Sequence, residues 1–593
     1  MKKLSNVLII LSSFVLLTGC VNDNAGMKKA RVNNANDVDG FNVTTNLEEE
    51  KVIHTERQAT YLAYDGDYKT IPEADYPDGQ KHLSDPNPVN LVWEYTAPSG
   101  KTISRYDIVW GKEADLSDGY TIKGTANPSL DVYNSYLGDN YFRIVANYTD
   151  GTNDGSKIQK YTVEDVYPRN LRIEGMTNCR DMGGGRELAS GGRIKQGLIY
   201  RTSATNNWAY GRGDVSDRLT DAGKEELLVR LGCKTEINVN NSGSNEVGVQ
   251  NFVDAYMYYD AGKHHMYRNT EPLKEAFHAL ANPDNYPVFY HCRIGTDRTG
   301  FMAIMLSALL GVSENDIYQD YLFSNFGNIQ EKRYIGEKAG RDNILKYMDD
   351  LKTYPGELLQ NKCYNFLLSI GIPAEELDSI IDILTEGTKA EGNNNHQEVI
   401  LAEDFEADGT EMKEITATSG NASRAHPKKY FTLGEGQSVS VTFKPDYSGE
   451  AKLLAYLGST DSSASKFIDD SIALEFDGSD IEIDEITFAD AGFGTGESRT
   501  YYAPVMLATV DVVKGDTPVT ITGLANNLNI GALALIPIEK VADEPVEPVN
   551  PPVNPDKPSK SGCGGSIALS VSVMSMMALG SMAFLSIKRR KED

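Results

Sequence analysis

The strongest chemical signal in the 593-residue sequence is a cysteine followed six positions later by an arginine. The segment reads His291-Cys292-Arg293-Ile294-Gly295-Thr296-Asp297-Arg298-Thr299-Gly300. Before it stands the strand-like run Val288-Phe289-Tyr290, and after it an apolar stretch predicts a helix over 299–311. Cys292 is therefore expected to end a strand and Arg298 to begin a helix, with the residues between them forming a loop.

Such a loop is suited to bind an anion and to activate a thiol. The backbone N–H groups of the loop and of the first helical turn would point inward and cradle a phosphate. Gly295 lets the chain turn where a side chain would obstruct it, and the Arg298 guanidinium can bind two phosphate oxygens. The same positive field favours thiolate over thiol, so Cys292 should have a lowered pKa and act as a nucleophile. A thiolate that faces a bound phosphate predicts covalent phosphoryl transfer.

This segment resembles the signature of the cysteine-dependent phosphatases, which is His-Cys, five residues, Arg and Ser/Thr. The resemblance implies that Cys292 attacks phosphorus, that Arg298 holds the phosphoryl oxygens and that Thr299 hydrogen-bonds the sulfur and helps it leave. It also implies a set of substrate-binding residues, namely His291, Arg293, Ile294, Gly295 and Thr296. The alternatives are a domain that binds phosphate without turnover and a surface cysteine without a role.

A second pair of motifs narrows the resemblance. The segments Thr177-Asn178-Cys179-Arg180-Asp181-Met182-Gly183-Gly184 and Gly197-Leu198-Ile199-Tyr200-Arg201-Thr202-Ser203 are similar to the Asn-Phe-Arg-Asp-Leu-Gly-Gly and Leu-Tyr-Arg-Ser motifs of bacterial tyrosine and lipid phosphatases with an HCxxGKDR-type loop. The resemblance covers about 170–330. In that group the loop supplies the general acid, which implies that Asp297 protonates the leaving group and then activates water. The residues expected to support the loop are Asn178, Arg180, Asp181 and Arg201.

Several features depart from that pattern. Thr296 stands where the group has a lysine, which removes a positive charge and favours a monoester over multiply charged inositol lipids. Asn238-Val239-Asn240 replaces an Asp-Leu-Arg strand end, so Asp260 is kept as an alternative general acid. No tryptophan is followed by Pro-Asp, so the mobile acid loop of the eukaryotic-type enzymes is not recognisable. Cys179 replaces a phenylalanine and is expected to pack in the core rather than to act as a resolving thiol for Cys292.

Other polar residues have two interpretations each. Arg180 and Asp181 would either brace the loop as an ion pair or stabilise an ordinary turn, and Arg201 has a similar pair of interpretations. His264 and His265 are adjacent, but no carboxylate cluster accompanies them at ligand spacing, so a solvated loop is expected rather than a metal site. The predicted chemistry requires neither a metal nor a cofactor.

The surrounding elements predict a multidomain chain, with an α/β domain between two all-β sandwiches. The α/β domain is expected over 169–388, with a central sheet flanked by helices that include 219–231 and 374–384. Alternating apolar residues over 51–168 resemble a fibronectin type III or immunoglobulin-like sandwich. Those over 397–540 resemble jelly-roll carbohydrate-binding modules, so this domain is expected either to bind a glycan or to act as a spacer.

The N-terminal residues predict export. Residues 1–20 resemble a bacterial lipoprotein signal peptide with Cys20 as the lipidated residue, and an ordinary signal peptide is the alternative. Residues 21–50 are polar and are expected to form a flexible tether.

The C-terminal residues predict a second anchor. A proline-rich stalk is expected over 541–565. It leads to an uncharged stretch over 566–587, which is long enough to cross a membrane as a helix, although a buried core helix is the alternative. A basic cytoplasmic tail follows over 588–593. The protein is thus expected at the extracellular face of a bacterial cell membrane, held by a lipid, by the transmembrane helix or by both.

Composition excludes several classes of protein. The formal net charge of −28 disfavours binding to nucleic acid. Six cysteines are too few to form a disulfide scaffold in a chain of this length. A hydrophobic content of 40% is enough to bury several cores.

Together these observations predict an extracellular, membrane-anchored hydrolase that cleaves phosphate monoesters of the phosphotyrosine type. Its partner would be a phosphorylated protein or a small phosphate monoester. One alternative keeps the chemistry and changes the substrate to inositol phosphates or phosphoinositides. The other is a surface adhesin in which the phosphatase-like domain is degenerate and the flanking modules bind glycans.

Overall fold

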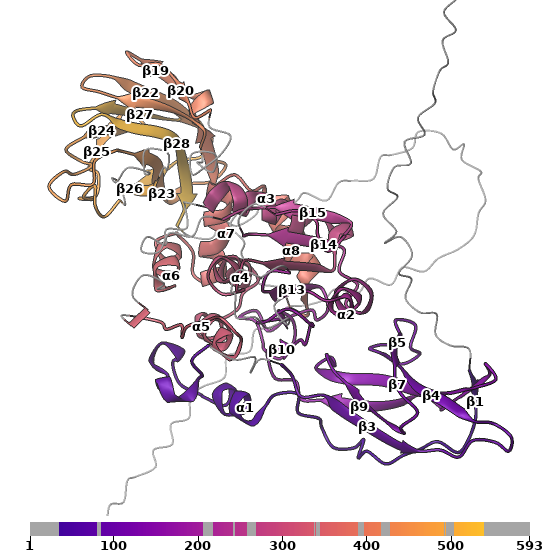
Figure 1. The fold of residues 1–593 in the computed structure, drawn as a ribbon. Helices are drawn as coiled ribbons and strands as arrows, with labels where there is room; N and C mark the ends of the chain where they lie inside the picture. Colours follow the sequence, from indigo (N-terminus) through magenta and orange to yellow (C-terminus); the bar gives the residue numbers. More distant parts are fainter. Residues whose placement is uncertain are drawn as a thin grey trace, which may run out of the picture. The chain divides into compact units, whose positions relative to one another are not determined.

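The computed structural model describes residues 35–79, 85–205, 218–240, 243–257, 269–336, 338–339, 344–388, 396–416, 427–491, 493 and 503–538. Within them an α/β domain stands between two β-rich regions in the sequence (Figure 1). The predicted signal peptide, lipidation site, stalk and membrane helix lie outside this part of the chain. None of the helices described there is long and apolar enough to cross a membrane.

A six-stranded sheet forms the centre of the α/β domain, in the order β10-β11-β13-β16-β14-β15. Its strands are β10 (Arg169–Asn170), β11 (Arg180–Asp181), β13 (Ile199–Thr202), β16 (Val288–His291), β14 (Thr235–Asn238) and β15 (Asn251–Asp254). The last four of these are parallel to one another. Every residue of β13, β16 and β14 is buried, as expected of parallel strands covered on both faces.

Helices cover both faces of this sheet. Val288 and Tyr290 belong to a core shared with α3, α4, α7 and α8, whereas Phe289 belongs to a core that contains Leu227 and Leu231. The helices are α2 (Asp221–Glu225) with a π-helical continuation (Glu226–Arg230), α3 (Thr270–Ala281), α4 (Asp297–Leu309), α5 (Glu314–Phe323), α6 (Leu345–Lys352), α7 (Leu359–Ser369) and α8 (Ala374–Leu384). A short pair, β12 (Arg193–Ile194) and β17 (Thr385–Glu386), joins the domain's two ends.

Two sheets enclose one apolar core in the N-terminal β-rich region. One contains β1 (Asn36–Asp37), β8 (Asn153–Gly155), β7 (Gly138–Tyr148), β4 (Ile103–Gly111), β5 (Tyr120–Lys123) and β9 (Gln159–Val163). The other contains β2 (Asn42–Val43), β3 (Val89–Glu94) and β6 (Ser129–Val132). Alternate residues of β3 and β4, among them Leu91, Trp93, Ile108 and Trp110, meet in this core. Its assignment to the fibronectin or immunoglobulin type stays a prediction.

The structure corrects the prediction of a flexible tether over 21–50. From residue 35 onward this segment belongs to the sandwich, because β1 pairs with β8 and β2 pairs with β3. Phe41 stacks on Tyr95 with ring centroids 3.8 Å apart, and Val43 packs against the sandwich core. The two strands are too short for their pattern to be seen among polar neighbours.

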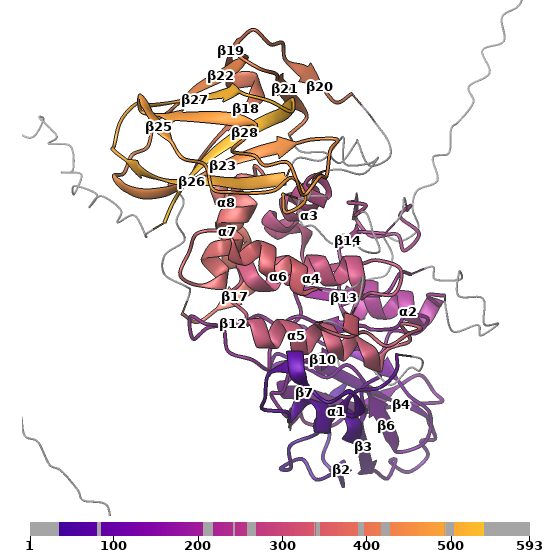
Figure 2. The ribbon, with the colours of Figure 1, turned by 90° about the vertical axis from the view of Figure 1, so that its left-hand side faces the viewer.

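The structure also corrects the all-β prediction near residue 51. Helix α1 (Glu56–Leu62) and the 3-10 turns η2 (Tyr68–Thr70) and η3 (Glu73–Asp75) follow there. They pack on the α/β domain, where α1 lies beside α5 (Figure 2). The Tyr61 hydroxyl donates to the Gln319 carbonyl oxygen at 2.8 Å. Tertiary packing thus assigns 55–79 to the neighbouring domain.

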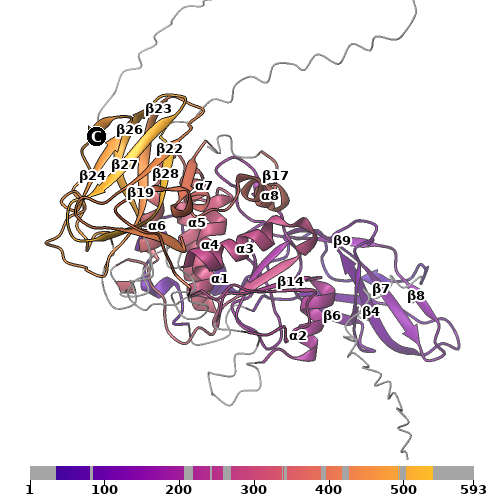
Figure 3. The same ribbon diagram turned by 90° about the horizontal axis from the view of Figure 1, so that it is seen from above.

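Two further sheets enclose the core of the C-terminal β-rich region (Figure 3). One contains β20 (Lys413–Glu414), β21 (Lys429–Leu433), β28 (Leu528–Pro537), β23 (Gly449–Gly458), β26 (Ala503–Val512) and β18 (Glu398–Leu401). The other contains β19 (Glu406–Asp408), β22 (Ser438–Phe443), β27 (Thr517–Gly523), β24 (Ile472–Phe476) and β25 (Ser479–Ile481). Alternate residues of β23 face different cores, since Leu453 packs inside the sandwich and Tyr456 packs on the α/β domain. The Tyr456 hydroxyl lies 3.0 Å from Ser369 Oγ on α7.

Candidate active site

Cys292 lies at the carboxyl edge of the central sheet. The preceding residue, His291, is in register with Thr202 at the end of β13 and with Asn238 at the end of β14. Helix α4 begins at Asp297, so the intervening residues form a loop at the edge where ligands bind in open parallel sheets. The predicted order of strand, loop and helix is therefore found.

Gly295 allows the loop to pass close to β13. Its φ angle is +74°, in the left-handed region that favours glycine. A Cβ atom at this position would lie 2.6 Å from the Thr202 carbonyl oxygen. The loop can therefore keep its conformation only with glycine at this position.

The surroundings of Cys292 favour its thiolate. The residue is buried, and burial by itself would raise the pKa of the thiol. The positive charge of Arg298 and a hydrogen bond from Thr299 outweigh this effect, so the pKa of Cys292 lies below the ordinary value of 9.0. The Thr299 hydroxyl also accepts the Cys292 backbone N–H at 2.6 Å. Arg298 and Thr299 both belong to the first turn of α4.

His291 contacts protein groups through both ring nitrogens. Its Nδ1 lies 3.1 Å from the Cys292 carbonyl oxygen, and its Nε2 lies 2.9 Å from Glu236 Oε1. His291 and Glu236 are both buried. These contacts place the His291 ring against the Cys292 backbone and Glu236, and its role in substrate binding stays a prediction. Glu236, which the sequence analysis did not single out, holds the ring from β14.

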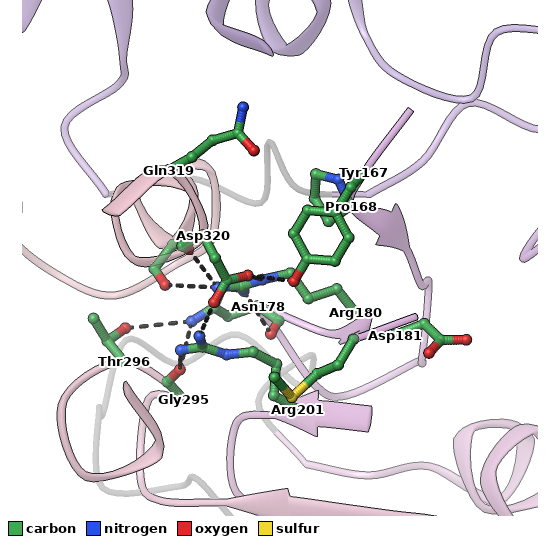
Figure 4. A network of polar contacts seen from close by, with 12 residues as sticks. Tyr167, Pro168, Asn178, Arg180, Asp181, Arg201, Gly295, Thr296, Gln319 and Asp320 are labelled. Atoms are coloured by element: carbon green, nitrogen blue, oxygen red, sulfur yellow. Dashed lines mark hydrogen bonds and ion pairs between the residues drawn. The ribbon is translucent and has the colours of Figure 1, made fainter. Parts of the chain in front are cut away.

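Polar side chains hold the loop from behind (Figure 4). Asn178 Nδ2 donates to the carbonyl oxygens of Ile294 and Gly295 at 3.3 and 3.0 Å, and to Thr296 Oγ1 at 3.3 Å. Arg201 donates to the Gly295 carbonyl oxygen at 2.9 Å. Asn178 and Arg201 therefore bind the loop at Ile294, Gly295 and Thr296.

Arg180 and Asp181 have different partners. Arg180 donates to Asn178 Oδ1 and pairs with Asp320 at 2.8 Å. Asp181 pairs with Arg169 at 2.8 Å and accepts backbone N–H groups of two nearby glycines. Adjacent residues of a strand point to opposite faces, and Figure 4 shows Asp181 pointing away from the network. Arg180 therefore supports the loop, whereas Asp181 stabilises the turns around 183 and 197.

Asp320 of α5 lies at the centre of this polar network and was not among the residues predicted from the sequence. Its carboxylate pairs with Arg180 and Arg201 and accepts a hydrogen bond from the Tyr167 hydroxyl at 2.6 Å. Burial opposes ionisation, but the two arginines outweigh it and hold the pKa of Asp320 well below its ordinary value. One signal was available in the sequence: Asp320 falls on the same helical face as Ile317 and Tyr321, where an apolar residue is expected.

Asp297, the expected loop acid, is held by an arginine from outside the loop. Arg333 donates from Nε to Asp297 Oδ1 at 3.0 Å and from Nη2 to Oδ2 at 3.2 Å. The alternative acid, Asp260, lies outside the described residues, as do His264 and His265. Cys179 is buried in the apolar core, as expected, and its thiol donates to the Thr177 carbonyl oxygen at 3.3 Å.

The side chains of the described residues show no arrangement typical of a metal centre. Within the described ranges, no group of three or more His, Cys, Asp or Glu residues could hold a metal ion. The loop instead brings together a thiol of lowered pKa, the arginine Arg298 at the start of a helix, and a carboxylate. Groups of these kinds are chemically able to attack, bind and, for a protonated carboxyl group, protonate a phosphate ester.

Comparison with known families agrees with this geometry. Residues 233–372 match the model of a family described as the tyrosine phosphatase family. The chain contains a phosphatase domain. The match includes β14, the Cys292 loop and helices α3 to α7, whereas the motifs around Asn178 and Arg201 precede it.

Two curated relatives carry names of the same kind. A protein of Cupriavidus necator named as a tyrosine-protein phosphatase is 27% identical in an alignment of 190 residues that covers 27% of this chain and 64% of the relative. The triple specificity protein phosphatase PtpB of Mycobacterium tuberculosis is 27% identical over 179 residues, which is 30% of this chain and 62% of that protein. The chain thus spans less than two thirds of the length of either relative.

Solved structures similar to part of the chain include carbohydrate-binding modules. A family 35 module from Clostridium thermocellum is 13% identical and covers 24% of this chain and 98% of its own, with a TM-score of 0.19. The C-terminal CBM6 of LamC from Zobellia galactanivorans is 14% identical and covers 24% and 98%, with a TM-score of 0.17. Scores of this size carry no argument about ligands, so glycan binding by residues 397–540 stays a prediction.

Proposed function

We propose that the phosphatase domain hydrolyses phosphate monoesters of the phosphotyrosine type through a phosphocysteine intermediate. The observation that carries the proposal is the thiol of Cys292, which lies at the carboxyl edge of the sheet with its pKa lowered by Arg298 and Thr299. A buried thiol without such partners would have a raised pKa, as burial does to Cys233 and Cys363. This contrast supports a nucleophile at position 292.

In the first step, the Cys292 thiolate attacks phosphorus and an S–P bond forms while the ester P–O bond breaks. Backbone N–H groups of the loop and the Arg298 guanidinium bind the phosphoryl oxygens, whose charge is stabilised at the start of α4. The leaving oxygen takes a proton from Asp297, which is the carboxyl group closest in sequence to this arginine.

In the second step, water attacks phosphorus and the S–P bond breaks. Asp297, now a carboxylate, takes a proton from this water, and inorganic phosphate leaves. The hydrogen bond from Thr299 stabilises the departing Cys292 thiolate. Asn178, Arg201 and Arg180 keep the loop in the conformation that both steps use.

Steady-state kinetics of the full chain test this proposal. Cys292→Ser should lower kcat for p-nitrophenyl phosphate by at least about 10³-fold, because a serine hydroxyl at this site is not ionised. Cys363→Ser is the matched control, since Cys363 is a buried cysteine of α7 and should leave kcat nearly unchanged. Retained turnover in Cys292→Ser would overturn the mechanism.

The substrate is tested with the same protein. A phosphotyrosine peptide should be turned over with a higher kcat/KM than an inositol polyphosphate or a phosphoinositide. The buried Thr296 supports this order, because it places a neutral side chain in the loop. A higher kcat/KM for the inositol compounds would show that the substrate class is inositol phosphates or phosphoinositides rather than phosphotyrosine-type monoesters.

We also propose that the phosphatase domain acts outside the cell, tethered to a bacterial membrane. The signal-like residues 1–20, with Cys20, and the uncharged stretch 566–587 before a basic tail support this location. Protease treatment of intact cells should remove the phosphatase domain. Protection of the domain in intact cells and cleavage only after lysis would contradict this location.

A further inference from the structure

Arg333 is the side chain that fixes the carboxylate of Asp297. Its guanidinium binds both carboxylate oxygens, through Nε and Nη2, in the bidentate geometry that gives an arginine–carboxylate pair its orientation. The exposed fractions of the two side chains are 8% and 14%, so water screens this pair only weakly. The second partner of Arg333 is Glu331 at 3.1 Å, whose side chain is 73% exposed.

The segment that carries Arg333 is held in place on several sides. Asn325 binds the backbone of Arg333 twice, accepting its N–H at 2.7 Å and donating to its carbonyl oxygen at 3.1 Å. Ile329 donates its backbone N–H to the Gly79 carbonyl oxygen at 2.8 Å, and Asn328 donates to Thr177 Oγ1 at 2.9 Å. Arg333 therefore reaches Asp297 from a fixed backbone rather than from a loose surface loop.

We propose that Arg333 is a positioning residue. It orients the Asp297 carboxyl group and thereby affects the proton transfers that Asp297 carries out. This inference rests on the proposed function of Cys292 and Asp297. Asp297 is the first residue of α4, where its side chain could otherwise rotate towards solvent. Arg333 restricts it to one orientation, and general acid–base catalysis depends on that geometry.

The Arg333–Asp297 pair is compatible with both proton transfers of the proposed reaction. When Asp297 donates its proton to the leaving oxygen, it becomes a carboxylate, and both of its oxygens can then accept from Arg333 as the structure shows. When it takes a proton from water in the second step, one oxygen becomes a hydroxyl, while the other can still accept from the guanidinium. Arg333 thus orients Asp297 in both protonation states without itself exchanging a proton.

Kinetics on two substrates test this role in the full chain. Phenyl phosphate has a poor leaving group that needs an acid, whereas 2,4-dinitrophenyl phosphate has a good leaving group that does not. Phosphoenzyme formation should be measured in a single turnover, so that the first step is observed alone. For Arg333→Ala we expect a loss of about 10-fold or more with phenyl phosphate and less than about 3-fold with the dinitrophenyl ester. Arg193→Ala, which removes an exposed arginine that pairs with Asp165 at 2.9 Å, is the matched control and should leave both rates unchanged.

The Asp297→Asn background separates positioning from a general structural effect. If Arg333 acts through Asp297, adding Arg333→Ala to Asp297→Asn should lower the rate with phenyl phosphate by less than about 2-fold. Arg333→Lys should restore only part of the rate, because an ammonium group cannot bind both oxygens in the same plane. Equal losses in both backgrounds, or equal losses on both substrates, would overturn the inference.

The outcomes also distinguish failure of the inference from failure of the proposed function. An inactive wild-type chain, or an active Cys292→Ser variant, would overturn the proposed function itself. A wild-type chain that is active through Cys292, with an Arg333→Ala variant as active as wild type on phenyl phosphate, would overturn only the role of Arg333.

Discussion

At the scale of single residues, the chemistry depends on the side chains that stabilise the thiolate form of Cys292. Burial opposes the thiolate, while Arg298 and Thr299 favour it and prevail. The other cysteines of the phosphatase domain are also buried, and burial raises their pKa values because no neighbouring charge or hydrogen bond outweighs it, not even the charge of Arg180 near Cys179. Cys292 should therefore react with alkylating reagents at lower pH than the other cysteines of the phosphatase domain.

The pH dependence of alkylation tests this difference. Because the pKa of Cys292 is lowered, its thiolate should be present at pH values below 9.0, where an ordinary thiol is mostly protonated. Inactivation of the wild-type chain by iodoacetamide should accordingly reach half its maximal rate below pH 9.0. Arg298→Ala removes the main favourable charge, so the midpoint should move to higher pH. An unchanged midpoint in this variant would show that Arg298 does not set the charge of the thiol.

At the scale of elements, strand β16 and helix α4 present the loop, and helix α5 holds it through Asp320. This carboxylate is buried between Arg180 and Arg201, which in turn bind the loop directly or through Asn178. Removing one partner from a buried ion-pair network leaves uncompensated charges.

Asp320→Asn should therefore lower the free energy of unfolding by about 3 kcal/mol at pH 7, and kcat should fall with it. The pKa of Asp320 is below its ordinary value of 3.8, so its contribution is present above that pH and is lost as the pH falls further. Urea denaturation at several pH values should show the difference from wild type shrinking below pH 3.8. Asp316→Asn, on the same helix but only half-buried, is the control and should cost less than about 1 kcal/mol.

Only part of the site could be predicted from the sequence. The loop between β16 and α4 could be predicted because its cysteine, glycine and arginine are consecutive in one short segment. The ion-pair partners of Asp320 and Arg333 could not be predicted, because these side chains reach the loop only through tertiary packing of α5 and of the segment that follows it. The contact of His291 with Glu236 could not be predicted for the same reason, since the two residues are 55 positions apart in sequence.

At the scale of the whole molecule, segments outside the predicted range 169–388 contribute residues to the core of the phosphatase domain. Tyr61, Tyr68 and Tyr76 come from the N-terminal part and Tyr456 from the C-terminal part. Tyr167, in the segment that leads from the first sandwich, donates to Asp320. The sequence predicted separate domains, because the side chains that join them have no pattern of their own.

A fragment limited to residues 169–388 should consequently be less stable than the chain over 35–541. It loses these aromatic side chains, each of which contributes about 2 kcal/mol by burial, and exposes the faces that they cover. Calorimetry should show a lower Tm for this fragment, and a longer fragment over 35–388 should recover part of the difference. Equal Tm values for all three would show that the flanking regions do not stabilise the phosphatase domain.

The central claim is a covalent bond between Cys292 and phosphate. The most direct test is acid quenching of the full chain during turnover of p-nitrophenyl phosphate, followed by mass spectrometry of its peptides. We expect one added phosphoryl group on the peptide that contains Cys292, present in wild type and absent in Cys292→Ser. Turnover by the wild-type chain with phosphate on another residue, or with no phosphate on the protein, would contradict it.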